Sequence, residues 1–499
     1  MSHQKNKLDN SRRAFRLWPY MLGFLLVNLL LLICHEIGVI DALCWAGADT
    51  FSTDPVMLVS DWGIFNFDYG TSPLWSILLI PFAWLNLPLN VANVLSLFIM
   101  AVATWLFLRQ ISEYTRGKKR VALILIVLLS AGFLYYNATL SSGMALGVLA
   151  LAIMLGVYKN RMEKPAFYAT SLILMCLANT YSVGLALILS VGWMVERIKN
   201  RKKQRRLGRE IMQRNSGIWS VVALVVTVAI FSVTLIQLVG DFKLDWEAIN
   251  DFLLDFNEKL FGITLPILEL ILIFTLLMFL VKYPKLFIYE FLGLGCYLVI
   301  LYVENSNIGQ LVCGATMLIV VLVSLYIILQ TEEPCRTPKW LRKSELVGLL
   351  DKRGVVEAFL LVPVALSVPA TVIASGYEVT QRYDYVADMA NYLNGLPKEA
   401  EIAIIGISTP ILVTALIPLL DDNHFVTTYS NDTFLDGVKN DEEAENNTEE
   451  WRLYPESHGF YVLKEVGNCS DDNALTMPED WEMLERFDKL AVYHQKLGL

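Results

Sequence analysis

The sequence predicts a polytopic α-helical membrane protein that carries a small α/β domain at its C-terminal end. Hydrophobic residues make up 55% of the 499 residues and charged residues only 18%, and the mean hydropathy is +0.49. This composition is too apolar and too poor in charge for an ordinary soluble enzyme. Apolar segments alternate with short loops up to residue 375, and the chain then becomes polar and acidic.

The first apolar segment fixes the predicted orientation of the chain. It covers 18–39, follows a basic tail at 1–17 and is long enough to span a bilayer. Basic flanks favour the cytoplasm, so we expect the N-terminus inside and residues 36–90 outside. Within that external loop the apolar stretch 74–87 is short and is closed by Pro88, which suits a helix at the membrane interface better than a crossing.

The remaining apolar segments give about eleven transmembrane helices when every basic cluster is placed on one side. Two of them, 167–178 and 183–195, are predicted as short spans hinged at 179–182, because a single span would place the most basic loop outside. An external segment at 241–262 has the pattern of an amphipathic interfacial helix. The spans predicted after the first are 91–108, 121–136, 144–158, 167–178, 183–195, 218–239, 265–281, 286–303, 311–329 and 355–374.

Residues 376–499 are predicted to form an extracytoplasmic α/β domain with a mostly parallel sheet, separate from the transmembrane domain at 18–375. Strand and helix patterns alternate along this region, which is typical of such a domain. The predicted helices are 383–393, 409–420 and 479–487 (EDWEMLERF), and the predicted strands are 401–406, 424–430, 459–466 and 489–495.

The external loop at 36–90 is the first place where chemistry could occur. It holds five aspartates among many aromatic residues and has no Lys or Arg. The cytoplasmic loops reach about two dozen residues and contain no glycine-rich phosphate-binding motif, which argues against a soluble activated nucleotide as the substrate. A lipid-linked donor presented at the outer leaflet fits better.

The order of these parts resembles the GT-C membrane glycosyltransferases. A first span leads into an acidic external loop with an early Asp, then Ser72-Pro73-Leu74-Trp75, a short interfacial helix and the second span. The chain is most similar to the bacterial protein-mannosyltransferase and aminoarabinose-transferase type. The segment YVADMANYLNGLPKEAEIAIIG, which starts at Tyr385, also resembles the start of the external domain found on many bacterial members.

The resemblance implies inverting transfer of a sugar from a polyprenyl-phosphate donor to a surface glycan, lipid or protein, at a bacterial plasma membrane. A loop Asp would be the general base, since a carboxylate in a partly desolvated, aromatic-lined site has a raised pKa. Asp49 matches the family position best. Members usually have Asp-Glu there and this chain has Asp49-Thr50, so Asp61 and Asp68 stay candidates, with Asp41 and Asp54 as further alternatives.

The donor site departs from the family pattern. Related enzymes often have Lys or Arg before the Pro-Pro-Leu equivalent, where this chain has Thr71-Ser72. No cofactor is predicted, a divalent metal stays open, and nucleic-acid binding has no support. The candidates for the donor phosphate are His35, Lys243, Lys259 and Arg382; Trp62, Tyr69 and Trp75 are sugar-stacking platforms or interfacial anchors; Glu269 is an intramembrane carboxylate.

Two other classes of function compete with this one. A transporter or lipid flippase would have two related halves with broken helices that meet at mid-membrane. The hinge at 179–182 and the prolines Pro363 and Pro369 are the features that favour it. The third class is a non-catalytic protein of cell-envelope assembly, whose C-terminal domain binds a partner.

Overall fold

The computed structural model describes two compact units, Met1–His35 with Phe51–Thr380, and Glu36–Thr50 with Gln381–Leu499. The described residues are 2–34, 45, 73–85, 87–115, 117–134, 136–139, 143–205, 210–239, 273, 275, 279, 282–296, 308–332, 334, 353–380, 386–397, 401–405, 425–429, 460–465, 481–487 and 490–495.

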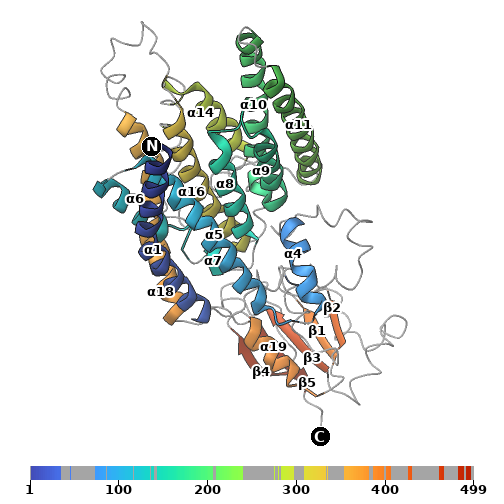
Figure 1. Ribbon diagram of the computed structural model, residues 1–499. Coiled ribbons are helices and arrows are strands. Elements are labelled where there is room, and N and C mark those ends of the chain that lie inside the picture. Colours follow the sequence, from blue (N-terminus) through green and yellow to red (C-terminus); the bar gives the residue numbers. More distant parts are fainter. Residues whose placement is uncertain are drawn as a thin grey trace. The chain divides into compact units, whose positions relative to one another are not determined.

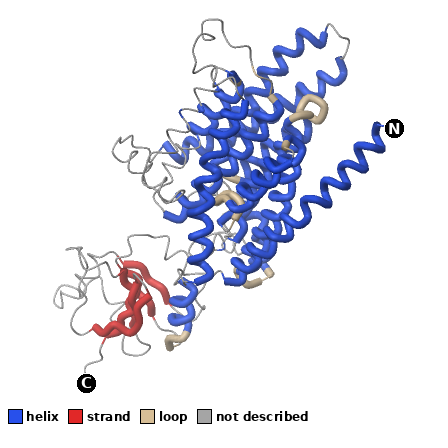
Figure 2. The backbone as a smooth tube through the Cα atoms, turned by 90° about the vertical axis from the view of Figure 1, so that its left-hand side faces the viewer, coloured by secondary structure: helices blue, strands red, loops and turns tan. Residues whose placement is uncertain are grey.

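The described part of the first unit is helical (Figures 1 and 2). Among the described residues, five stretches are long and apolar enough to cross a membrane, so the chain is a multi-pass membrane protein. The helices are α1 (Ser2–Cys34), α4 (Pro73–Trp84), α5 (Asn90–Tyr114), α6 (Gly117–Leu129), α7 (Tyr136–Thr139), α8 (Met144–Tyr158), α9 (Pro165–Ala178), η2 (Thr180–Ser182), α10 (Val183–Arg205), α11 (Glu210–Val239), α14 (Pro284–Ile288), the π-helical η3 (Tyr289–Leu294), α16 (Ile308–Thr331) and α18 (Arg353–Thr380).

The helical unit has two ends that differ in chemistry. We call one the basic end; it holds the start of α6, with Lys118 and Lys119, and the α8–α9 turn with Arg161. We call the other the loop end; there α1 stops at Cys34 and α4 begins at Pro73. In Figure 1 the start of α1 is its upper end, the adjoining ends of α10 and α11 lie at the top, and α4 lies toward the opposite end of this unit.

The outer surface of the helical unit is apolar. Side chains along α1 and α11 are strongly exposed, among them Trp18 at 58%, Ile33 at 73% and Val225 at 61%. Exposed apolar faces of this extent are typical of helices that contact lipid tails, whose chemistry matches that of the side chains. The core lies between α5, α8, α9, α10 and α16, where most side chains are buried.

Several predicted spans are confirmed as helices. The prediction 144–158 coincides with α8, and the predicted break at 179–182 is present. Asn179 has an extended backbone with φ −162° and ψ 123°, and η2 follows it directly. Arg161, just before α9, forms an ion pair with Glu196 on α10, so α9 and α10 run antiparallel as the hinge predicts.

The predicted span 121–136 is wrong in its second half. Helix α6 ends at Leu129, and the chain then forms a tight turn in which the amides of Phe133 and Leu134 donate to the carbonyl of Ser130 at 3.0 Å. The short helix α7 follows. Apolar composition alone does not distinguish this buried turn from a longer helix, because both are covered by protein.

Other boundaries differ or fall outside the described residues. Helix α1 already begins at Ser2, within the predicted tail, and α10 continues to Arg205 through part of the basic loop. The predicted span 265–281 is described at three positions, and 286–303 up to residue 296. The predicted interfacial helix 241–262 lies outside the described part.

The second unit contains helix α19 (Val386–Asn394) and a five-stranded sheet. The strand order is β2-β1-β3-β5-β4, with β1 parallel to β2 and β3, and β5 antiparallel to β3 and β4. The sheet is therefore mixed rather than mostly parallel. The strands are β1 (Glu401–Ile405), β2 (Phe425–Tyr429), β3 (Phe460–Glu465), β4 (Trp481–Phe487) and β5 (Leu490–Gln495).

The predicted helix EDWEMLERF is wrong, because this segment forms β4. Phe487 pairs with Leu490, so two residues connect β4 to β5 in a hairpin, and the register shifts at Leu484. The helix-forming Glu, Met and Leu of this segment misled the prediction, since strand preference depends mainly on pairing and packing. Burial supports the predicted helix at 383–393: Met389, Ala390 and Leu393 of α19 are buried. The predicted helix 409–420 lies outside the described residues.

Candidate functional site

Most residues predicted from the sequence to form the site lie outside the described residues. Trp75 is described: its side chain is fully buried on α4, so its indole face is not open at the surface. Helix α4 contacts α9, which fixes the end of the external loop to the helical unit. The candidates outside the described part are His35, Asp41, Asp49, Asp54, Asp61, Trp62, Asp68, Tyr69, Lys243, Lys259, Glu269 and Arg382.

Three helices that begin or end at the loop end are too short to cross a bilayer. Helices α6, α8 and α9 have 13, 15 and 14 residues, which at 1.5 Å per residue gives lengths of about 20–22 Å. A hydrocarbon core is about 30 Å thick. If the ends of these helices at the basic end lie at one membrane surface, their ends toward the loop end stop inside the membrane. We call these inner ends, with the turns that follow them, the tips.

The tip between α6 and α8 is buried and polar. Asn93 of α5 donates from Nδ2 to the carbonyl of Thr139 at 2.7 Å, and Asn137 donates from Nδ2 to the carbonyl of Gly132 at 2.9 Å. The Thr316 hydroxyl on α16 donates to Asn137 Oδ1 at 3.0 Å. These asparagine and threonine side chains are at most 2% exposed, so the amide groups are fully enclosed by protein.

The tip between α9 and α10 lies beside the first one. Asn179 donates from Nδ2 to Met144 Sδ at 2.9 Å and accepts from the Ser182 hydroxyl at 3.4 Å. The neighbouring Thr180 is 3% exposed, and its hydroxyl has no partner among the described residues. We call the buried polar residues of the two tips and the side chains bonded to them the polar floor: Asn93, Asn137, Thr139, Asn179, Thr180, Ser182 and Thr316.

The polar floor lies below the start of α16. Thr316 stands eight residues after Ile308, where α16 begins, and eight residues of helix measure about 12 Å. Non-helical backbone at membrane depth occurs where protein covers it or where it lines a water-filled space. The floor is therefore recessed from the loop end of α16.

The chemistry of the floor is that of neutral hydrogen-bonding groups. Helices α5, α8 and α10 all begin here, so their positive dipole ends point toward the loop end. The floor contains no Asp, Glu, Lys or Arg, so it can orient a polar group but not exchange a proton at neutral pH. Among the described residues no group of three or more His, Cys, Asp or Glu could hold a metal ion.

The polar floor was not predicted from the sequence, although two polar segments of the sequence indicate it. The tips read YYNATLSSG and NTYS, which are polar interruptions of long apolar stretches. Polar residues inside the membrane are costly and are usually functional. The prediction used the second interruption only as a hinge, and it placed the first one in an external turn.

Close packing at the floor gives a testable effect at Gly147. A Cβ at this position would lie 2.8 Å from Asn179 Cβ, closer than real contacts allow. We expect Gly147→Ala to destabilise the protein by about 1–3 kcal/mol, because α8 or α9 must move. Thermal unfolding in detergent measures the change.

Gly156→Ala on the same helix is the matched control. Its nearest atom would be the flexible end of Gln110 at 3.2 Å, and alanine favours a helix over glycine by about 1 kcal/mol. This variant is expected to be neutral or slightly stabilised. Equal midpoints for the two variants would contradict tight packing at the floor.

Comparison with known proteins gives one structural match. No protein-family model matches the chain, and no curated protein matches it. Among solved structures the chain is similar to the crystal structure of ArnT from Cupriavidus metallidurans bound to undecaprenyl phosphate, at 12% sequence identity and a TM-score of 0.44. The match covers 96% of this chain and 97% of that chain.

Proposed function

We propose that the chain is a membrane glycosyltransferase that acts at its loop end, on a sugar carried by a polyprenyl phosphate. The observation that carries this proposal is the meeting of two features. An acidic, aromatic loop without any basic residue leads directly into α4, and α4 packs on α9, whose end forms part of the recessed polar floor.

The two features supply different parts of the chemistry. The floor offers buried amides, hydroxyls and helix N-termini that can orient a polar head group. A loop aspartate supplies the base that the floor lacks, with Asp49 as the first candidate and Asp61 and Asp68 as the others. The acceptor hydroxyl or amine attacks the anomeric carbon, the aspartate takes its proton, and the lipid phosphate leaves.

A lipid-linked donor follows from the setting of the site. The outer faces of α1 and α11 are apolar and strongly exposed, so a polyprenyl chain can lie in the bilayer against the helices. Its phosphate then reaches the loop end at the membrane surface. His35, Lys243, Lys259 and Arg382 are the proposed ligands of that phosphate, and Trp62, Tyr69 and Glu269 are proposed contacts of the sugar or the acceptor.

Mass analysis of surface glycans tests the function in cells. A strain that lacks the gene is restored with the unchanged protein or with Asp49→Asn at equal membrane abundance. We expect one sugar substituent to disappear in the deletion strain, to return with the unchanged protein and to stay absent with Asp49→Asn. Full restoration by Asp49→Asn would exclude this residue as the base, and a deletion without any glycan change would contradict the proposed function.

A further inference from the structure

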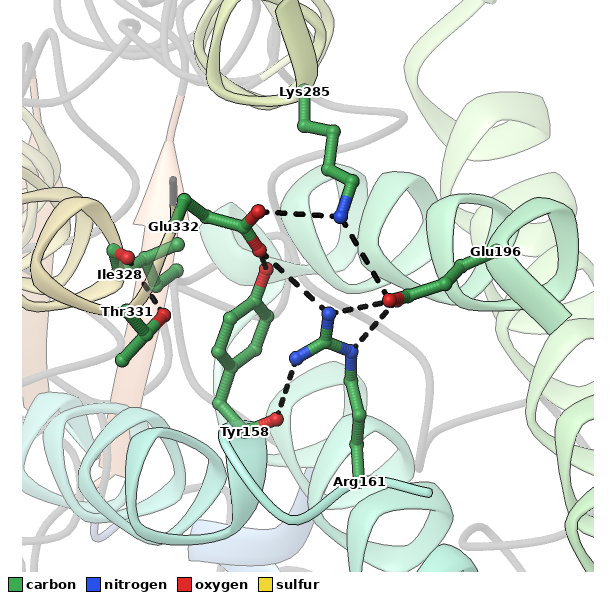
Figure 3. Close-up of polar contacts among 7 residues, drawn as sticks. All are labelled: Tyr158, Arg161, Glu196, Lys285, Ile328, Thr331 and Glu332. Atoms are coloured by element: carbon green, nitrogen blue, oxygen red, sulfur yellow. Dashed lines mark hydrogen bonds and ion pairs between the residues drawn. The ribbon is translucent and has the colours of Figure 1, made fainter. Parts of the chain in front are cut away.

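A closed ring of four charges joins the helices at the basic end (Figure 3). Arg161 Nη2 lies 2.7 Å from Glu196 Oε2 and 3.6 Å from Glu332 Oε1. Lys285 Nζ lies 3.2 Å from Glu332 Oε2 and 3.8 Å from Glu196 Oε1. Each cation therefore contacts both carboxylates, and the ring has no net charge. We call these four residues the charge ring.

Arg161 is the best-held member of the ring. Its Nε and Nη2 both donate to Glu196, at 2.9 and 2.7 Å, and Nη1 donates to the Tyr158 carbonyl at 2.8 Å. The guanidinium also lies 4.3 Å from the centre of the Tyr158 ring, and the Tyr158 hydroxyl donates to Glu332. A planar guanidinium can make these contacts at once, and an ammonium cannot.

The ring is enclosed by protein. The side chains of Arg161, Glu332 and Glu196 are 12%, 15% and 22% exposed, and Lys285 is 47% exposed. Burial lowers the pKa of Arg161, but the neighbouring Tyr158 and Glu196 raise it by more, so the net pKa lies above its ordinary value. The guanidinium therefore stays charged throughout the physiological pH range.

An aromatic layer closes the bundle beneath the ring. Tyr168 of α9 makes edge-to-face contacts with Tyr158 at 6.2 Å and with Trp193 of α10 at 4.9 Å. Tyr289 lies so close to Gly192 that a Cβ there would be 2.7 Å from its hydroxyl oxygen. All of these aromatic side chains are at most 5% exposed, so they are packed against the surrounding protein.

The ring and a second ion pair tie together seven helices at this end. The ring residues come from the α8–α9 turn, α10, α14 and the end of α16. Glu357 of α18 pairs with Lys119 of α6 at 2.5 Å and accepts from Gln330 of α16 at 3.0 Å. Opening the basic end would separate several partly buried charges, which is strongly unfavourable.

We propose that the charge ring is a permanent lock that keeps the basic end closed, so that polar substrates reach the helical unit from the loop end alone. A transporter that works by alternating access must open both ends in turn, and the lock opposes this. The inference concerns the basic end and holds independently of the proposed glycosyl transfer.

Hydrogen–deuterium exchange of the full-length protein in lipid nanodiscs tests the lock. In the unchanged protein we expect slow, single-population exchange at 155–165, 193–199, 282–290 and 326–332. Arg161→Met keeps an unbranched apolar side chain and removes the guanidinium and its charge, and it is expected to speed exchange in these segments about tenfold or more. Exchange at the loop end, at 90–97 and 136–146, should stay within twofold of the unchanged protein by the same reasoning.

Arg109→Met is the matched control. Arg109 pairs with Glu113 at 3.9 Å on the exposed surface of α5, with side chains 61% and 47% exposed, and such pairs contribute little. Hydrogen–deuterium exchange in Arg109→Met should therefore equal that of the unchanged protein. Arg161→Lys keeps the charge and loses the paired donors, so its exchange rate should lie between those of the unchanged protein and Arg161→Met. It also replaces Arg161→Met as the test variant if Arg161→Met does not fold.

Two outcomes would overturn the lock. The first is an exchange rate in Arg161→Lys that equals the rate in Arg109→Met at the basic-end segments. If Arg161→Met folds, the same equality in that variant counts in the same way. The other is a bimodal pattern in the unchanged protein at the basic-end segments, because it would reveal a population in which this end is open.

Discussion

Replacement of Asp49 by Asn is expected to lower the rate of sugar transfer about 10²–10⁴-fold, the usual contribution of a general base. Asn has nearly the same shape but cannot take the acceptor proton. Donor binding should change little, since the carboxylate acts on the acceptor. Initial rates of purified variants, at equal protein amounts, measure the effect.

Asp61→Asn and Asp68→Asn are the comparison variants, because both lie in the same acidic stretch as Asp49. They are expected to keep most of the activity if Asp49 is the base. A large loss in one of them alone would move the role to that residue. Full activity in all three variants would contradict an aspartate base among these candidates.

Phe133→Ala is expected to give the largest loss of stability, about 3–5 kcal/mol. Phe133 is fully buried in the turn between α6 and α7, and its ring meets Phe107 of α5 edge to face at 5.2 Å. Removing it leaves a cavity where the turn packs against α5, α16 and α18. Loss of this support should also lower transfer activity, because Asn137 of the polar floor donates to the Gly132 carbonyl in this turn.

Phe167→Ala is the matched control for this experiment. Phe167 lies on α9 and is 70% exposed, so its removal creates no cavity. Thermal unfolding in detergent should show a lower midpoint for Phe133→Ala and an almost unchanged midpoint for Phe167→Ala. Equal midpoints would mean that the buried turn contributes little to the stability of the bundle.

The sequence predicts long, uniform elements well and interrupted ones poorly. Helix α8 was predicted to the residue, because its apolar stretch ends at Gly143 on one side and at a basic turn on the other. The end of α6 was missed, since the buried turn at Ser130–Leu134 is as apolar as a helix. The strand β4 was missed because its residues favour a helix in isolation, whereas pairing with β5 decides its state.

The two sites also differ in how well the sequence predicts them. The acidic loop is visible in the sequence because it concentrates aspartates and aromatics within one stretch. The charge ring is not visible, since its members are spread from Arg161 to Glu332 and meet only through packing. Glu196 and Glu332 nevertheless left a signal: each is an acidic residue at the basic end of an apolar span, against the prevailing charge pattern.

Transfer in detergent is the most direct test of the central claim. Envelopes of the deletion strain, which contain both donor and unmodified acceptor, are solubilised and mixed with purified protein. A detergent solution has no compartments, so a transporter cannot create product there, but an enzyme can. We predict that the missing sugar appears on the acceptor and that free polyprenyl phosphate is released in equal amount. No transfer in detergent, together with lipid movement in vesicles that contain the protein, would contradict the glycosyltransferase proposal and support a flippase.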